Sequence, residues 1–314
     1  EEFDPDYIVR AWVNDEETVK FSTDPMRGII TFETAPSIPD TIGQTNVIIQ
    51  FRKTIKGYRD RITKCTMVEQ FDNRVFFSGN PDYPNVLFHS ALEDPTYCSD
   101  LDYYEEGNDD SKITSIVTGN NALWVLKEPS QSNTTIFYHN PALDDTYGKI
   151  YPSVHSSIST GCVAKGINFN DVISFFSDRG MEGITGDVTT EQALEHRSSL
   201  VDNKLLNEKN YKNLILEKWE GYLLVIIDNK IYLADSKTMF KNNDQAEYEW
   251  YYWEFAKNIT STLVKDGVLY LCSDKEIYTL TKTGEVEAYW TTLEDEFTCP
   301  QYQKTTNKKG CVVD

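Results

Sequence analysis

The acidic residues between Glu93 and Asp110 are the densest group of potential metal ligands in this sequence. The segment contains eight acidic residues and no basic one. Asp100, Asp102 and Asp109 or Asp110 carry the hard oxygen atoms that calcium prefers, but the glycine and the closing glutamate of an EF-hand loop are misplaced. We therefore interpret the segment as a solvated acidic loop and predict no metal site.

The run His196-Arg197-Ser198-Ser199 contains side chains that also occur in hydrolase active sites. Thr189 and Gln192 form a capping box, which predicts a helix over 190–207. The apolar stripe of this helix consists of Leu194, Val201 and Leu205. Since no paired base or nucleophile signature lies nearby, we interpret the run as the polar surface of that helix.

Catalytic motifs are absent from the rest of the sequence. It contains no P-loop, no dinucleotide fingerprint, and no G-x-S-x-G or H-E-x-x-H pattern. A glycosidase needs a set of carboxylates around one pocket, and nothing selects such a set from the 50 acidic residues. We predict no catalytic residue, no cofactor-binding residue and no metal ligand, and we do not expect an enzyme.

A turn dipeptide followed by an apolar run recurs about every 50 residues. The dipeptides are Asp72-Asn73, Asn120-Asn121, Asn170-Asp171, Glu220-Gly221 and Asp266-Gly267. Such dipeptides accept the positive φ angles of a two-residue hairpin turn. The runs that follow them are RVFFSG, ALWVLKE, VISFFSD, YLLVIID and VLYLCSD. Because these runs are apolar at most positions, each is expected to be a strand covered on both faces.

Further strand-like runs flank these units. They lie at 65–71, 113–119, 162–169, 214–219 and 259–265 before the turns, and at 85–92, 134–140, 230–236 and 276–282 after the apolar runs. Up-and-down sheets of three or four strands at this period are typical of a β-propeller. The sequence therefore predicts an all-β fold, a β-propeller with five recognisable blades. A sixth blade, supplied by the N-terminal residues, is the alternative.

The repeat divides the chain into three parts. Residues 1–58 do not carry it, and their alternating strands predict a small β module or a partial blade leading into the ring. Residues 59–293 are assigned to the propeller with the helical insert 190–207. Residues 294–314 are interpreted as a truncated, strand-like tail. The missing initiator Met and the end inside a strand-like run lead us to expect a domain of a longer protein.

The run 248–255, YEWYYWEF, closes the fourth repeat and consists mainly of aromatic residues. Such a strand could stack on sugars, but packing against the next blade is the stronger interpretation.

Charge and composition limit the partners of the chain. Its formal net charge is −20, so phosphate groups are repelled and a sequence-specific nucleic-acid role is not expected. The apolar runs are too short to span a membrane. The six cysteines are scattered, and we predict that all six thiols are free.

Several runs carry a family resemblance. They are GIITFETAP, NVIIQFRKTIKGY, NRVFFSGNPDYPNVLFHSALEDPTYC, HRSSLVDNKLLNEKN, YEWYYWEF, YWTTLEDEF and KTTNKKG. Together they cover most of the chain and resemble β-propeller virion proteins of tailed bacteriophages, described as tail-hub, stabilisation or nozzle-type proteins. The SGNP segment and the aromatic strand with the closing YWTT are the most specific parts.

The resemblance implies a structural role without catalytic residues. It predicts a component of a phage or prophage tail or neck, made in the cytoplasm of the bacterial host and built into the virion. Its partners would be other tail or neck proteins, with a homo-oligomeric ring as one arrangement of the full-length protein. A carbohydrate-binding or glycoside-hydrolase propeller that acts on host surface glycans is the alternative. Partner binding is expected through 93–110, 190–207 and 7–57.

Overall fold

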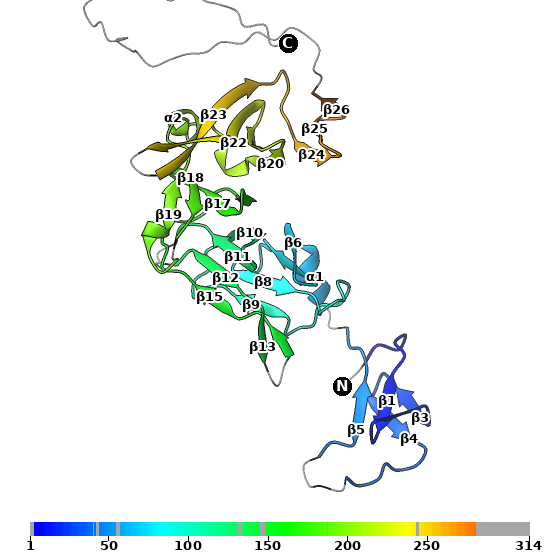
Figure 1. Ribbon diagram of the computed structural model, residues 1–314. Coiled ribbons are helices and arrows are strands. Elements are labelled where there is room, and N and C mark those ends of the chain that lie inside the picture. Colours follow the sequence, from blue (N-terminus) through cyan, green and yellow to red (C-terminus); the bar gives the residue numbers. More distant parts are fainter. Residues whose placement is uncertain are drawn as a thin grey trace, which may run out of the picture. The chain divides into compact units, whose positions relative to one another are not determined.

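A computed structural model describes residues 3–39, 41, 44–54, 57–130, 134–144, 148–186, 188–242 and 245–280, and its elements are labelled in Figure 1. The chain forms two compact units, Glu1–His155 and Ser156–Asp314, which are described one at a time. Residues 281–293 of the predicted propeller and the tail 294–314, which we predicted as strand-like, lie outside the described residues. Among the described helices, none is long and apolar enough to cross a membrane.

The first unit begins with a small β module. Its strands are β1 (Arg10–Val13), β2 (Glu16–Thr18), β3 (Phe21–Asp24), β4 (Ile29–Phe32) and β5 (Val47–Gln50). One sheet has the order β2-β1-β5, and β3 and β4 form a separate hairpin. Because this order is not sequential along the chain, the module is not a further copy of the repeated sheet.

Two four-stranded sheets follow the short helix α1 (Tyr58–Thr63) in the first unit. The first contains β6 (Met67–Phe71), β7 (Arg74–Ser78), β8 (Val86–His89) and β9 (Tyr103–Glu105). The second contains β10 (Ile113–Gly119), β11 (Ala122–Lys127), β12 (Ile136–His139) and β15 (Ser153–His155). A hairpin of β13 (Ala142–Asp144) and β14 (Gly148–Ile150) is inserted in the second sheet.

The second unit contains two more four-stranded sheets and one of three strands. The third sheet contains β16 (Gly166–Phe169), β17 (Val172–Ser177), β18 (Gly180–Ile184) and β19 (Leu194–His196). The fourth contains β20 (Ile215–Trp219), β21 (Tyr222–Ile227), β22 (Lys230–Asn242) and β23 (Gln245–Glu254). The fifth contains β24 (Ser261–Lys265), β25 (Val268–Ser273) and β26 (Glu276–Thr279).

The predicted repeat is confirmed at its turns and at its second strands. Both residues of all five marked dipeptides have positive φ, for example 47° at Asp72 and 62° at Asn73. The five apolar runs are the second strands of five different antiparallel sheets, and each sheet follows the order of the chain. The fold is therefore all-β and built of propeller-like blades. Their arrangement about one axis stays a prediction.

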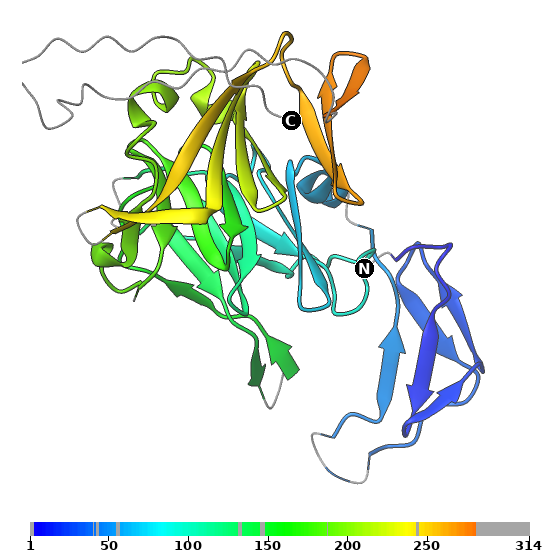
Figure 2. The ribbon, with the colours of Figure 1, turned by 45° about the horizontal axis from the view of Figure 1, so that its top comes forward.

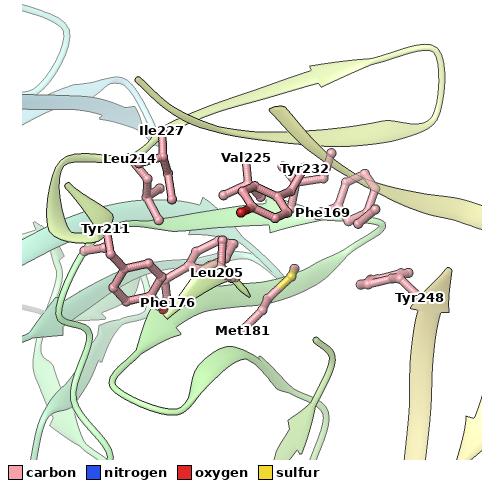
Figure 3. Close-up of a cluster of buried hydrophobic side chains, with 13 residues drawn as sticks. Phe169, Phe176, Met181, Leu205, Tyr211, Leu214, Val225, Ile227, Tyr232 and Tyr248 are labelled. Carbon is pink, nitrogen blue, oxygen red and sulfur yellow. The ribbon is translucent and has the colours of Figure 1, made fainter. Parts of the chain in front are cut away.

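The expected cover on both faces is wrong for β7 and β25, in which fully buried and less buried residues alternate. The second strand of the fourth sheet is covered on both faces, as its composition predicts. Leu223, Val225 and Ile227 pack in a cluster with the third sheet, which Figure 3 shows in part. Leu224 and Ile226 pack in a second cluster with the fifth sheet. At about 25 cal/mol per Å² of apolar surface, these two layers of contacts make β21 a main source of stability in this unit.

The predicted helix over 190–207 is wrong. The segment contains a 3₁₀ turn at Glu191–Ala193, the strand β19 and the short helix α2 (Asp202–Leu205), and a second 3₁₀ turn follows at Tyr211–Asn213. Leu194 pairs with Ile184 on the free edge of β18. The apolar spacing reflects separate contacts of separate elements, because the need of β18 for a hydrogen-bonded neighbour outweighs helix propensity.

Most of the aromatic run packs on the sheet that precedes it, and the expected contact with the next blade is made by Phe255, whose ring lies 5.2 Å from that of Tyr278. On one face of β23, Tyr248, Trp250 and Tyr252 join the cluster shared with the third sheet. On the other face, Tyr251 and Trp253 are 46% and 38% exposed. The long β22–β23 hairpin, drawn in yellow tones, carries them in Figure 2.

Candidate functional site

The side chains best suited to acid–base or nucleophilic chemistry lie in two polar clusters, one in each unit. The His196 cluster of the second unit contains Glu182, His196, Ser198 and Asp202. His196 Nε2 lies 2.6 Å from Asp202 Oδ2, and its Nδ1 lies 3.4 Å from Glu182 Oε1. Two carboxylates therefore face one imidazole at the end of the third sheet.

Hydrogen bonding keeps His196 positively charged. The pKa of His196 is raised to about 10, first by its hydrogen bond with Asp202 and then by Glu182. A protonated imidazole cannot accept a proton, so it is unsuited to act as a general base at neutral pH. Ser198 Oγ donates to Asp202 Oδ1 at 2.6 Å and accepts from the amide of Met181 at 2.8 Å. Ser198 is therefore not aligned as a nucleophile activated by His196.

Gly180 allows the His196 cluster to close. Its φ is 126°, in the region that favours glycine. A Cβ at this position would meet Asp202 Oδ1 at 2.3 Å and Ser198 Oγ at 2.5 Å. The backbone fits there only without a side chain, so the cluster is closed to a ligand of any size from this side.

Arg197 and Ser198 of the predicted surface run are turned inward as well, whereas Ser199 is exposed. Arg197 is buried, its guanidinium pairs with Glu195 at 2.7 Å, and its carbonyl accepts the indole N–H of Trp250 at 3.1 Å. Ser199 donates to Glu247 of β23. The interpretation of this run as helix surface is therefore wrong, because these side chains join the third sheet to the fourth.

The Glu106 cluster of the first unit is more deeply buried. Glu106 and His139 are both 0% exposed, and Glu106 Oε1 lies 2.8 Å from His139 Nε2. Ser153 donates to the other carboxylate oxygen at 2.6 Å. The remaining ring nitrogen of His139 faces the carbonyl of Tyr151 at 2.9 Å. Every polar atom of this pair thus has a partner, as a buried charge requires.

The positive charge beside the acidic segment is that of Lys127. The Lys127 ammonium is fully buried, donates to the carbonyl of Glu106 at 2.5 Å, and lies 3.0 Å from Asp109 Oδ1. Asp102 instead accepts the amide of Ser99 at 2.8 Å. The aspartates that we weighed as calcium ligands serve different partners. Among the described residues, no group of three or more acidic, histidine or cysteine side chains could hold a metal ion.

The acidic segment is therefore only in part the solvated loop that we predicted. Its residues Tyr103–Glu105 form strand β9, and Glu106 is in the core. The sequence offered no signal for this, since Glu105 and Glu106 are adjacent and identical, yet one is exposed and the other buried.

Cavities and thiols add no reactive centre in the described part of the chain. A shallow hollow of about 400 Å³ lies between the hairpin turns at Asn170 and Gly221, and the titratable side chains in its lining are Asp171, Lys218 and Tyr222. The four described cysteines are free thiols, and burial raises the pKa of Cys65 and Cys98 to about 11. Thiols with raised pKa values are poor nucleophiles. Cys299 and Cys311 lie outside the described residues.

Comparisons with known proteins give structural likeness alone. No family model and no curated protein matches the chain. Three solved structures are similar to it: an extracellular domain of a one component system from B. thetaiotaomicron (11% identity, TM-score 0.40), the β-propeller domain of Cps50 (Swd1) from Myceliophteria thermophila (14%, 0.39) and the AfRom2 CNH domain (10%, 0.38).

The extent of these matches varies. The alignments cover 85%, 69% and 90% of this chain, and 29%, 64% and 88% of the three structures in the same order. The chain thus spans less than two thirds of the first two. With TM-scores of this size, the assignment of the fold rests on the sheets described above.

Proposed function

We propose that this chain is a non-enzymatic structural component of the tail or neck of a tailed phage or prophage, where it acts as a protein–protein interaction scaffold. It is built into virions after synthesis in the bacterial cytoplasm. Its partners are other tail or neck proteins, and a ring of copies is one arrangement of the full-length protein.

The observation that carries the proposal is the inward direction of the chemically capable side chains. His196 and Glu106 hold strands and turns together, and their partners occupy the positions that a substrate would need. The resemblance to virion proteins, carried by the SGNP and YWTT segments, supplies the specific setting.

Outward apolar side chains support an interaction role. In the N-terminal module, Ile8, Val19, Met26 and Ile38 are each more than two-thirds exposed. Large apolar side chains with this much exposure, four of them within one small module, suit a site that contacts another protein. We propose this module as one contact surface in the assembled particle.

Mass spectrometry of purified phage particles tests the proposal. Particles induced from the source strain should contain the protein in an amount comparable to the other tail proteins. If the protein is present in the lysate but absent from intact particles, the proposal is wrong.

The glycan alternative is favoured by one observation. Tyr251 and Trp253 are partly exposed on the same face of β23, and Glu249 hydrogen-bonds the Tyr251 hydroxyl at 3.1 Å. Aromatic faces beside a carboxylate suit a sugar. Isothermal titration with host surface polysaccharide would detect such binding, and the Trp253→Ala variant should then abolish it. Cleavage of the polysaccharide would replace the structural proposal with the alternative.

A further inference from the structure

The outer surface of residues 92–105 combines exposed apolar side chains with negative charge. We call it the loop surface. Its exposed apolar residues are Leu92, Tyr97, Leu101 and Tyr103, and Leu101 is 79% exposed. Four large apolar side chains on one short segment are unusual for a surface that contacts only water.

The backbone of the loop surface is ordered by its own hydrogen bonds. The amide of Ala91 donates to the carbonyl of Tyr97 at 2.8 Å, and the amide of His89 donates to that of Asp102 at 3.0 Å. The amide of Glu93 donates to the carbonyl of Asn73 at 2.9 Å. The apolar side chains are thus held outward by a fixed backbone, which lowers the entropy cost of binding.

Five of the eight acidic residues between Glu93 and Asp110 show two opposite directions. Glu106 and Asp109 face inward to His139 and Lys127. Glu93, Asp100 and Glu105 are exposed, and within the described part of the chain no hydrogen bond or ion pair engages their carboxylates. The outward carboxylates stand beside Leu101 and Tyr103 with no basic residue between positions 92 and 111.

We infer that the loop surface binds a basic, apolar peptide segment of a partner protein. Lysine or arginine side chains of the partner would meet the outward carboxylates, and its apolar side chains would cover Leu101 and Tyr97. Charge complementarity of this kind speeds association and selects the partner. The same negative charge disfavours nucleic acids and anionic membranes.

This inference rests on the proposed scaffold function and names the chemistry of one partner. The probe is a fluorescent synthetic amphipathic peptide of lysine and leucine, titrated with the whole chain and followed by anisotropy. Two control peptides have serine in place of leucine or glutamate in place of lysine. The expected result is saturable binding of the probe, and affinity at least about tenfold weaker for either control peptide.

Variants locate the binding to the loop surface. Asp100→Lys with Glu105→Lys should weaken binding at least about tenfold, and so should Tyr97→Ser with Leu101→Ser. The matched controls change the same side-chain types elsewhere. They are Glu16→Lys with Glu33→Lys, and Leu143→Ser.

The controls make every outcome decisive. Binding lost in the loop variants and kept in the controls, with unchanged circular dichroism, supports the inference. Equal losses in loop and control variants, or no saturable binding, overturn it. Added salt should weaken binding of the probe, because ion pairs at an exposed surface are screened.

The inference and the proposed function can fail separately. If the protein is present in virions but the loop variants bind the peptide normally, only the inference about the loop surface is wrong. If the loop variants lose peptide binding but the protein is absent from virions, the scaffold function in the virion is wrong.

Discussion

The two polar clusters stabilise different parts of the fold. The Glu106 cluster joins the first sheet to the second, because Glu106 follows β9 and His139 belongs to β12, and both are fully buried. The His196 cluster stays beside one sheet, since Glu182 and His196 lie on neighbouring strands. His196 and Asp202 are 25% and 23% exposed.

The difference shows what each cluster contributes. A fully buried cluster specifies how two sheets pack, and the loss of one partner leaves a charge without solvent or counter-charge. A half-buried cluster fixes the path of the chain after its last strand, and water can replace part of a lost contact. The first should therefore be the more sensitive to mutation.

The largest effect is expected from Lys127→Met. Met keeps most of the buried aliphatic contacts, but it removes the donor to the Glu106 carbonyl and the cation beside Asp109. The unfolding free energy of the first unit should fall by about 3 kcal/mol, measured by urea denaturation. The exposed Lys112→Met is the matched control and should change it by less than about 0.5 kcal/mol. An equal effect of both variants would refute the ranking.

Gly180→Ala should have the next largest effect. The added Cβ would collide with Asp202 and Ser198 and force a residue with a side chain to φ 126°, so stability should fall by about 2 kcal/mol or more. Gly267→Ala is the matched control, because its φ is also positive but no atom lies within 4 Å of the new Cβ. Thermal unfolding followed by near-UV circular dichroism compares the two. If the two variants lose the same unfolding free energy, the His196 cluster does not depend on close packing against Gly180.

His196→Gln should cost about 1 kcal/mol near pH 6 and progressively less at higher pH. The pKa of His196 is raised from 6.5 to about 10 in the folded protein. Its stabilising contribution is therefore complete below pH 6.5 and is lost as the pH rises toward 10. Unfolding of both proteins between pH 6 and pH 10 should give curves that converge. A constant difference across this range would show that His196 contributes by packing alone.

The smallest effect on stability is expected from Asp100→Lys with Glu105→Lys. Both side chains are exposed, so the unfolding free energy should change by less than about 0.5 kcal/mol. Binding of the basic peptide should nevertheless weaken strongly. Urea denaturation beside the peptide titration separates these two results. A large loss of stability would mean that the outward carboxylates belong to the core network.

The repeat was predictable because its signal is local. Both residues of each marked dipeptide must adopt positive φ, and few residue types do so without strain, so dipeptides such as Asn120-Asn121 are visible in the sequence. The second strands β11, β17 and β21 are equally visible, since burial on both faces leaves no polar alternation.

The fourth strands of the first three sheets were not predictable. β9, β15 and β19 contain three residues each, too few for any periodicity, and they form only because a neighbouring strand offers its edge. The segment 190–207 matched a helical pattern by the chance spacing of Leu194, Val201 and Leu205. Tertiary pairing with β18 overrides that pattern.

The sequence shows which polar residues are available for the two clusters, but it does not show which of them contact one another. Glu106 and His139 are far apart in the sequence, and the order of the sheets brings them together. No feature of the sequence distinguishes Glu106 from Glu105, because the direction of each side chain depends on the register of β9 against β8. Sequence patterns identify the strands, whereas the partners of their polar side chains follow from the packing of the sheets.

Cross-linking mass spectrometry of intact purified virions tests the central claim most directly. A reagent that joins carboxylates to amines should link Asp100 or Glu105 to lysines of another virion protein, while Glu106 should remain unmodified. That result would show that inward side chains hold the fold and outward side chains bind partners. Absence of the protein from the particles, or links from this segment only within its own chain, would contradict the account.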